Sequence, residues 1–175
     1  MSASRNTPAP PKADRKRILL VVNPVASAVS ERLRSLAVSA LSSRFEVHQV
    51  VTDGPGHATE LARAADEGGM DAVVTFGGDG TANEAANGLA ESEVPLTCLP
   101  GGSANVYCGV TGTPRDLGGA VRQLLQRADN WTSRSVDAGT VNGRRFLFTS
   151  GAGLDAKVVA GVDARPDLKR RWRQW

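Results

Sequence analysis

The feature that most restricts the fold of this chain is a repeated alternation between short apolar runs and amphipathic segments. The apolar runs are nearly continuous, as in strands buried on both faces of a parallel sheet. We expect strands at residues 18–22, 45–51, 71–76 and 95–99. Between and after them, apolar residues spaced three and four apart predict helices over 31–41, 57–67, 81–89 and 116–127, the first capped by Ser30. Strands separated by helices in this way indicate a doubly wound α/β domain.

The third expected strand runs into a glycine turn, Gly77, Gly78, Asp79 and Gly80, and then into a helix. We expect the glycines to let the backbone adopt positive φ and approach a ligand without a Cβ in the way. Thr81 is expected to cap the helix, so that free amides and the positive end of the helix dipole face the turn. The pattern predicts an anion site, although an ordinary tight turn is the alternative. Because Asp79 would repel an anion, we expect it to act through Mg²⁺ or to engage a hydroxyl.

Small and polar residues also follow the other strands. Asn23 and Pro24 end the first strand, Thr52 ends the second, and the segment 100–105 follows the fourth. Since ligands of doubly wound domains bind beyond the carboxyl ends of the strands, we expect these residues to gather around the glycine loop.

The pattern changes after residue 130. Residues 131–141 and 144–150 flank Asn142 and Gly143, which predicts a β-hairpin with a type I′ turn. We therefore expect a nucleotide-binding α/β domain over 18–130, followed over 131–175 by the beginning of a β-rich second domain that is incomplete in this sequence. Residues 1–17 are basic, proline-containing and without apolar periodicity, so we expect a disordered tail.

The charge distribution argues against a nucleic-acid partner. The net charge is +3, but residues 1–17 contribute +4 and residues 163–175 contribute +3, so the part between them is acidic. No run approaches the roughly 18 apolar residues of a membrane span, and the N-terminus lacks the apolar core of a signal peptide. We expect a soluble, cytoplasmic protein without a transmembrane segment. Its basic ends are either solvated tails or contacts for an anionic membrane surface.

Other candidate motifs carry less weight. Residues 151–156 fit the glycine fingerprint of dinucleotide-binding folds, but the second strand and the acidic residue about 20 positions on that such a fold needs are not in this sequence. No Walker lysine motif occurs, and His48 and His57 are expected to be surface or capping residues. Cys98 and Cys108 lack metal spacing and are expected to be reduced core cysteines.

Taken together, the motifs resemble the diacylglycerol kinase catalytic domain family, which includes bacterial lipid kinases and sphingosine kinases. The resemblance rests on Asn23-Pro24, on Gly77-Gly78-Asp79-Gly80-Thr81-x-Asn83-Glu84-x-x-Asn87-Gly88-Leu89, and on Leu99-Pro100-x-Gly102-Ser103-x-Asn105. Val136-Asp137-x-Gly139-x-Val141-Asn142-Gly143-Arg144-x-Phe146 and Gly151-x-Gly153-x-Asp155-Ala156 extend it toward the family's second domain. One departure concerns the first loop, where the family reads Asn-Pro-x-Ser-Gly. Here Val25-Ala26-Ser27 follows Asn23-Pro24, so the hydroxyl is displaced and the glycine is missing.

The resemblance implies ATP and Mg²⁺ as cofactors and transfer of the γ-phosphoryl group to a hydroxyl of diacylglycerol or a sphingoid-type lipid at a membrane surface. It implies that the nucleotide is held by Asn23, Pro24, Thr52, Gly77, Gly78, Asp79, Gly80, Thr81, Asn83, Glu84, Gly102, Ser103 and Asn105. Asp79 would be the catalytic and metal-binding residue, and Asp155 would face the lipid head group. The base of bacterial diacylglycerol kinases lies in a later part of the second domain, outside this sequence.

Two other functions stay open. NAD kinases share a Gly-Gly-Asp-Gly-Thr loop, although the Asn83-Glu84 pair and the segment 100–105 favour the lipid kinases. The second alternative is a nucleotide-binding module without catalytic activity. The sequence does not decide whether the protein forms a homodimer.

Overall fold

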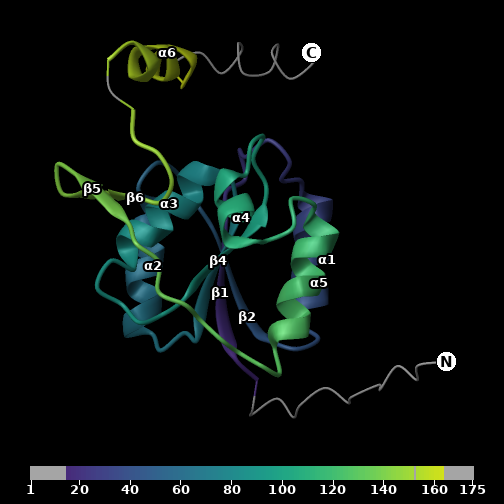
Figure 1. Ribbon diagram of the computed structural model, residues 1–175. Helices are drawn as coiled ribbons and strands as arrows, with labels where there is room; N and C mark the ends of the chain where they lie inside the picture. Colours follow the sequence, from purple (N-terminus) through teal and green to yellow (C-terminus); the bar gives the residue numbers. More distant parts are fainter. Residues whose placement is uncertain (1–14, 152, 164–175) are drawn as a thin grey trace.

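A computed structural model describes residues 15–151 and 153–163 of the chain. The main sheet consists of β1 (Arg17–Val22), β2 (Glu46–Val51), β3 (Ala72–Gly77) and β4 (Leu96–Pro100), all parallel. Their order across the sheet is β2-β1-β3-β4. The predicted doubly wound α/β class is therefore confirmed (Figure 1). Most of the predicted tail and the basic stretch after residue 163 lie outside the described residues.

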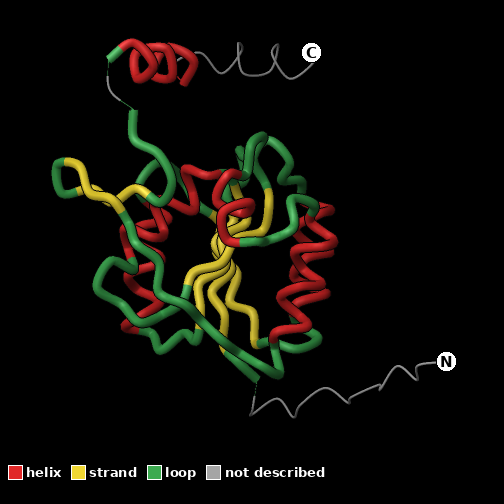
Figure 2. The backbone as a smooth tube through the Cα atoms, viewed as in Figure 1, coloured by secondary structure: helices red, strands yellow, loops and turns green. Residues whose placement is uncertain are grey.

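Helices cover both faces of this sheet. They are α1 (Glu31–Leu41), α2 (His57–Glu67), α3 (Asp79–Gly88), α4 (Val106–Thr111) and α5 (Leu117–Arg127). Helices α1 and α5 lie on one face, and α2 and α3 lie on the other (Figures 1 and 2). As predicted, Ser30 caps α1 by accepting a hydrogen bond from the N–H of Leu33 at 3.3 Å.

The two faces are packed with side chains of different size. On the α1/α5 face, bulky residues such as Leu20, Phe76 and Leu41 are completely buried. The α2/α3 face is lined by small residues, namely Ala58, Ala62, Ala65 and Ala85. The two helices approach so closely that a Cβ on Gly88 would collide with the carbonyl oxygen of Thr59. This close packing fixes α3, the helix that begins at the glycine loop.

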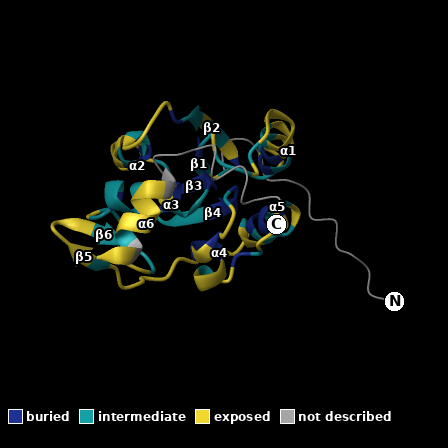
Figure 3. Cartoon of the chain, turned by 90° about the horizontal axis from the view of Figure 1, so that it is seen from above, coloured by how far each residue is buried: buried dark blue, intermediate teal, exposed yellow. Residues whose placement is uncertain are grey.

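The chain leaves this domain through an extended segment and a small hairpin. Strands β5 (Gly139–Val141) and β6 (Arg144–Phe146) pair antiparallel, and Asn142 and Gly143 have φ values of 50° and 75°, as a type I′ turn requires. The hairpin is confirmed but shorter than predicted, because residues 131–138 form no strand. Trp131 packs instead edge-on against Phe45, with ring centroids 5.8 Å apart, while residues 132–138 are exposed (Figure 3).

Helix α6 (Leu154–Asp163) follows the hairpin. None of the described helices is long and apolar enough to cross a membrane.

Candidate functional site

Three loops meet at the carboxyl edge of the sheet, where the chain leaves β1, β3 and β4. The N–H of Asn23 donates to the carbonyl of Phe76 at 2.9 Å, and the N–H of Gly101 donates to the carbonyl of Gly77 at 2.8 Å. The chain passes from β1 to one side of the sheet and from β3 to the other, so these two neighbouring strands form the topological switch point. Ligands of open α/β sheets bind in the crevice at this point.

The glycines of the site bring two loops into backbone contact. A Cβ on Gly102 would lie 2.7 Å from Cα of Gly78, and a Cβ on Gly101 would lie 2.9 Å from Cα of Gly77. Gly77 itself has no room for a Cβ, which would lie 2.6 Å from Oγ1 of Thr81. None of these glycines has a positive φ. The expectation of positive φ was therefore wrong. The loops that follow β3 and β4 need glycine because their backbones touch.

Thr81 does not cap α3, contrary to the prediction. The helix begins two residues earlier, with Gly78 as its N-cap and no side-chain hydrogen bond to the cap. Thr81 is buried in the first turn, where its Oγ1 accepts a hydrogen bond from Nδ2 of Asn23 at 3.0 Å. Oδ1 of Asn23 in turn accepts from the N–H of Val25 at 3.1 Å. The Asn23 side chain thus ties the first loop to α3.

Asp79, the first residue of α3, is half-buried and holds the neighbouring helix α4. Its Oδ1 accepts a hydrogen bond from the N–H of Tyr107 at 2.9 Å. The N-cap of α4 is Asn105, whose own side chain makes no capping bond. The Asp79 carboxylate therefore satisfies an otherwise unpaired amide at the start of α4, and it is fixed at the point where β3 ends.

The loop that follows β4, the second loop of this site, is closed by the side chain of Asn105. Its Oδ1 accepts from the N–H of Gly102, and its Nδ2 donates to the carbonyl of Gly102, both at 2.9 Å. Asn105 is buried in the left-handed region with φ of 48°, which asparagine tolerates better than most residues. Ser103 at the tip is exposed, and its Oγ lies 3.2 Å from Oγ of Ser27. The hydroxyl displaced in the first loop thus still lies at this edge.

Asn83 makes contacts away from the loops. On α3, Asn83 and Asn87 both donate to the carbonyl of Arg145 in β6, at 3.2 and 2.9 Å. Oδ1 of Asn87 accepts from the N–H of Arg145 at 2.8 Å, and Oδ1 of Asn83 accepts from the N–H of Leu147 at 3.2 Å. The two side-chain amides thus pair with the backbone of residues 145–147 in the way that a neighbouring strand would. Helix α3, which begins at the glycine loop, therefore also holds the hairpin.

The remaining predicted residues are placed as follows. Thr52 is buried at the end of β2, where its N–H donates to the carbonyl of Val22 at 2.8 Å. Pro24 is exposed in the first loop. Glu84 is half-buried in α3, and its carbonyl accepts from Oγ1 of Thr59 at 2.9 Å. Asp155 lies in α6, which stands apart from the glycine loop (Figure 1).

The start of α3 fits a phosphate group. The N-terminal amides of a helix lack intrahelical partners and attract anions, and no side chain caps this one. A Cβ on Gly80 would meet nothing within 4 Å, so the space beside the first turn is open. The described residues contain no cluster of three or more potential metal ligands. A single carboxylate such as Asp79 is compatible with Mg²⁺, because Mg²⁺ usually binds one or two carboxylates together with phosphates and water.

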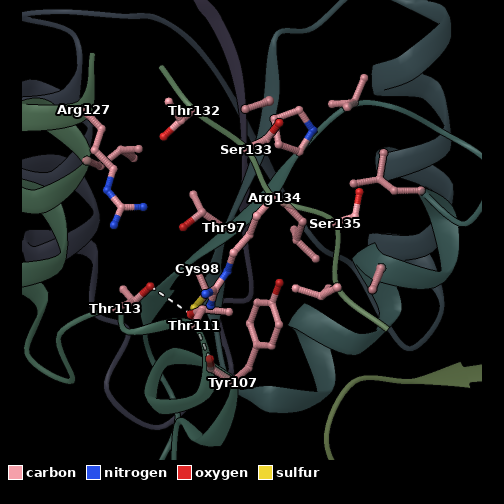
Figure 4. A pocket seen from close by; sticks show the side chains of 18 of the residues that line it. Thr97, Cys98, Tyr107, Thr111, Thr113, Arg127, Thr132, Ser133, Arg134 and Ser135 are labelled. Atoms are coloured by element: carbon pink, nitrogen blue, oxygen red, sulfur yellow. Dashed lines mark hydrogen bonds between the residues drawn. The ribbon is translucent and has the colours of Figure 1, made fainter. Parts of the chain in front are cut away.

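A cavity of about 830 Å³ lies elsewhere, beside the edge strand β4. It is bounded by β4, α4, α5 and the extended segment after α5, and it is lined by many hydroxyl groups (Figure 4). Cys98, Tyr107 and Thr113 lie on its wall, whereas the residues of the glycine loop do not line it. Burial raises the pKa of Tyr107 to about 12, so its phenol is protonated at neutral pH.

Sequence reasoning missed three features of this edge. The bond from Tyr107 to Asp79 joins residues that are 28 positions apart, and no local pattern marks it. The pairing of the Asn87 amide with Arg145 joins residues 58 apart. The contact between the Ser27 and Ser103 hydroxyls joins residues 76 positions apart and is not marked by any local pattern either. The spacing of Asn83 and Asn87, four residues apart on one helix face, is the single signal that could have been used.

The sheet order, the paired loops at the switch point and the open start of α3 define a doubly wound α/β domain with a candidate ligand site at the carboxyl edge. Comparison with known proteins identifies the family. Residues 17–141 match the diacylglycerol kinase catalytic domain. The chain belongs to this family, as the motifs of the sequence predicted.

Relatives and solved structures agree with this assignment. The chain is 33% identical over 159 residues to a protein named probable lipid kinase YegS-like from Pseudomonas aeruginosa, covering 90% of this chain and 50% of that protein. It is 30% identical to the diacylglycerol kinase of Bacillus subtilis, covering 86% and 50%. A crystal structure of a diacylglycerol kinase from Bacillus anthracis superposes with a TM-score of 0.67 at 30% identity, covering 77% of this chain and 46% of that one. The chain spans about half the length of the curated relatives it matches.

Proposed function

We propose that this chain is the ATP-binding part of a lipid kinase that transfers the γ-phosphoryl group of ATP to a lipid hydroxyl. The observation that carries the proposal is the junction of three loops at the switch point, with the uncapped start of α3 at its centre. The relatives named diacylglycerol kinase and lipid kinase support the reaction class. The acceptor we propose is diacylglycerol or a sphingoid-type lipid, presented at a membrane surface to a peripheral cytoplasmic protein.

Each site residue has a proposed task. The amides at the start of α3 would bind phosphate oxygens, and Ser27 and Ser103 would donate hydroxyl hydrogen bonds at the mouth of the site. Asp79, fixed by Tyr107, would hold Mg²⁺, which neutralises charge on the phosphates when bound. Phosphoryl transfer depends mainly on such positioning and charge stabilisation. Asn105 keeps the second loop closed, so that both loops present a fixed surface to the nucleotide.

The test of this function is a phosphorylation assay with γ-labelled ATP and Mg²⁺ on the complete gene product. Diacylglycerol, a sphingoid base and NAD are offered side by side. We expect a labelled lipid. Labelled NADP without labelled lipid would show an NAD kinase instead. Saturable ATP binding without any labelled product would show a nucleotide-binding module and would overturn the catalytic proposal.

The role of Asp79 is separable from its structural role by two variants. Asp79→Asn retains an Oδ1 that accepts from Tyr107 but loses the charge. We expect turnover to fall about 100-fold or more, as for other preorganised electrostatic groups, with the melting temperature unchanged. Asp79→Ala loses the hydrogen bond too, and we expect an additional cost of about 1 kcal/mol in unfolding free energy, as for other capping groups. Equal turnover in Asp79→Asn and the wild type would refute the metal-binding role.

A further inference from the structure

The two cysteines of the chain lie at the two ends of the loop that follows β4, with their side chains facing each other. Cys98 lies in β4 and Cys108 in the first turn of α4, and both are buried. Their sulfur atoms are 2.8 Å apart. A disulfide bond has a length of about 2.05 Å, so the sulfurs need to approach by less than about 1 Å. Burial of two cysteines in a core does not by itself require direct contact between their sulfur atoms.

The segment between these cysteines contains the part of the site contributed by β4. It includes Gly102, Ser103 and Asn105, and then Tyr107, whose N–H holds Asp79. A covalent bond between Cys98 and Cys108 would close a short ring around this loop. It would anchor the start of α4 to β4.

The two thiols differ in acidity. The hydrogen bond from Cys98 lowers the pKa of Cys108, and the nearby Arg115 guanidinium acts in the same direction, against burial and the Asp79 carboxylate. The same hydrogen bond raises the pKa of Cys98. Cys108 is therefore the more acidic of the two thiols, and the thiolate is the nucleophilic form of cysteine. Cys98, but not Cys108, lines the cavity beside β4 (Figure 4), so a small oxidant in the cavity approaches the pair from the Cys98 side, 2.8 Å from the Cys108 sulfur.

We propose that Cys98 and Cys108 are a modification site, at which a small hydroperoxide such as hydrogen peroxide forms a reversible intramolecular disulfide. The Cys108 thiolate attacks one peroxide oxygen, the O–O bond breaks, and the departing hydroxide takes up a proton to give water. The resulting sulfenic acid is attacked by the Cys98 sulfur, which displaces hydroxide. The Cys98 proton converts that hydroxide into a second water. Two thiols are oxidised and one peroxide is reduced.

The bond stabilises the folded domain and keeps the loop in place. Because the sulfurs move so little, the Gly102–Gly78 contact and the Tyr107–Asp79 hydrogen bond persist in the oxidised form. Closing a ring of this size restricts the unfolded chain. We expect the melting temperature to rise by roughly 5 to 10 °C, the shift typical of such a restriction in a domain of this length.

The experiment compares the reduced chain before and after treatment with hydrogen peroxide. We expect the intact mass to fall by the two hydrogens lost on forming one disulfide, both thiols to stop reacting with a thiol reagent, and dithiothreitol to reverse both changes. Since the chain has only two cysteines, a monomer with this mass contains the bond between Cys98 and Cys108. The melting temperature should rise in the oxidised wild type only.

Cys98→Ser and Cys108→Ser are matched controls. Each keeps one thiol and should show neither the loss of two hydrogens nor the rise in melting temperature. Oxygen adducts on the wild type without the disulfide species would overturn the proposal. Disulfide-linked dimers, or thiols that stay reactive under peroxide, would also overturn it. These outcomes are read on the wild type itself, so the test stands even if a serine variant folds poorly.

Discussion

The two edges of the parallel sheet are held together by different kinds of contact. At the amino edge, long charged side chains form bonds on the surface: Lys16 pairs with Asp71 at 3.0 Å, and Arg17 lies 3.9 Å from Glu46. At the carboxyl edge, the contacts are between backbones and short side chains, as between Gly102 and Gly78. Flexible exposed side chains can rearrange when one is lost, whereas touching backbones cannot. The carboxyl edge, where we propose that the nucleotide binds, should therefore tolerate substitution least.

The largest expected effect comes from adding a single carbon at the carboxyl edge. In Gly102→Ala the new Cβ would lie 2.7 Å from Cα of Gly78, so one of the loops must move. We expect a loss of about 2 to 3 kcal/mol in unfolding free energy, the cost of overpacking. ATP affinity should fall about tenfold or more, because both loops line the proposed nucleotide site. Chemical denaturation and calorimetric titration with ATP measure the two effects.

Gly80→Ala is the matched control for this variant. It places the same methyl group in the first turn of α3, where nothing lies within 4 Å. Because alanine also favours the helix, we expect unchanged stability or a gain of up to about 1 kcal/mol. If the two variants lost the same amount of stability, close approach would not be the reason for glycine at this edge.

A smaller effect is expected when the clamp of the second loop is removed. Asn105→Gly keeps a residue suited to φ of 48° but deletes both hydrogen bonds to Gly102. We expect a loss of about 1 to 2 kcal/mol, and faster hydrogen exchange at the amide of Gly102, which loses its acceptor. Asn105→Ala should cost more, because a Cβ remains in the left-handed region. Equal stability of the two variants would show that the backbone conformation of Asn105 carries no strain.

The amino-acid sequence predicted where the strands end better than it predicted which loops touch one another. Each strand of this sheet is signalled locally, because burial on both faces demands a continuous apolar run, as in β3. The end of such a run also marks a loop at the carboxyl edge. The positions of Asn23 and of the glycines were predictable in this way. The hairpin was predictable for the same reason, since Asn142 and Gly143 suit a type I′ turn wherever it occurs.

What the sequence did not reveal depends on residues far apart in the chain. The glycines were expected to have positive φ because glycine commonly allows this conformation in an isolated turn. Gly77 and Gly78 are glycine instead because the loop after β4, about 24 positions later, packs against their backbone. Thr81 was expected to cap the helix because the local sequence does not show its actual partner. That partner is Asn23, which lies 58 residues away in the chain. The meeting of Cys98 with Cys108 depends on how α4 turns back along β4. Local patterns place elements, and packing decides which of their atoms touch.

The smallest expected effect lies at the amino edge, in the response of Asp71 to acid. Burial raises the pKa of this carboxyl, but hydrogen bonds from the Arg17 N–H and the Lys16 ammonium outweigh it, so the pKa is lowered from 3.8. A lowered pKa in the folded state stabilises the fold above the unfolded value and loses that stabilisation as the pH falls through the folded value. Since the pair is partly exposed to solvent, we expect Asp71→Asn to cost less than about 1 kcal/mol at pH 7.

The difference between the Asp71→Asn variant and the wild type should stay constant from pH 7 to about pH 5 and shrink below about pH 4, because protonation removes the same charge from the wild type. Thermal unfolding at a series of pH values measures this difference. A cost at pH 7 as large as that of Gly102→Ala would contradict the contrast between the edges. It would mean that loss of the Lys16 and Arg17 contacts destabilises the fold as much as disruption of the backbone contact at the carboxyl edge.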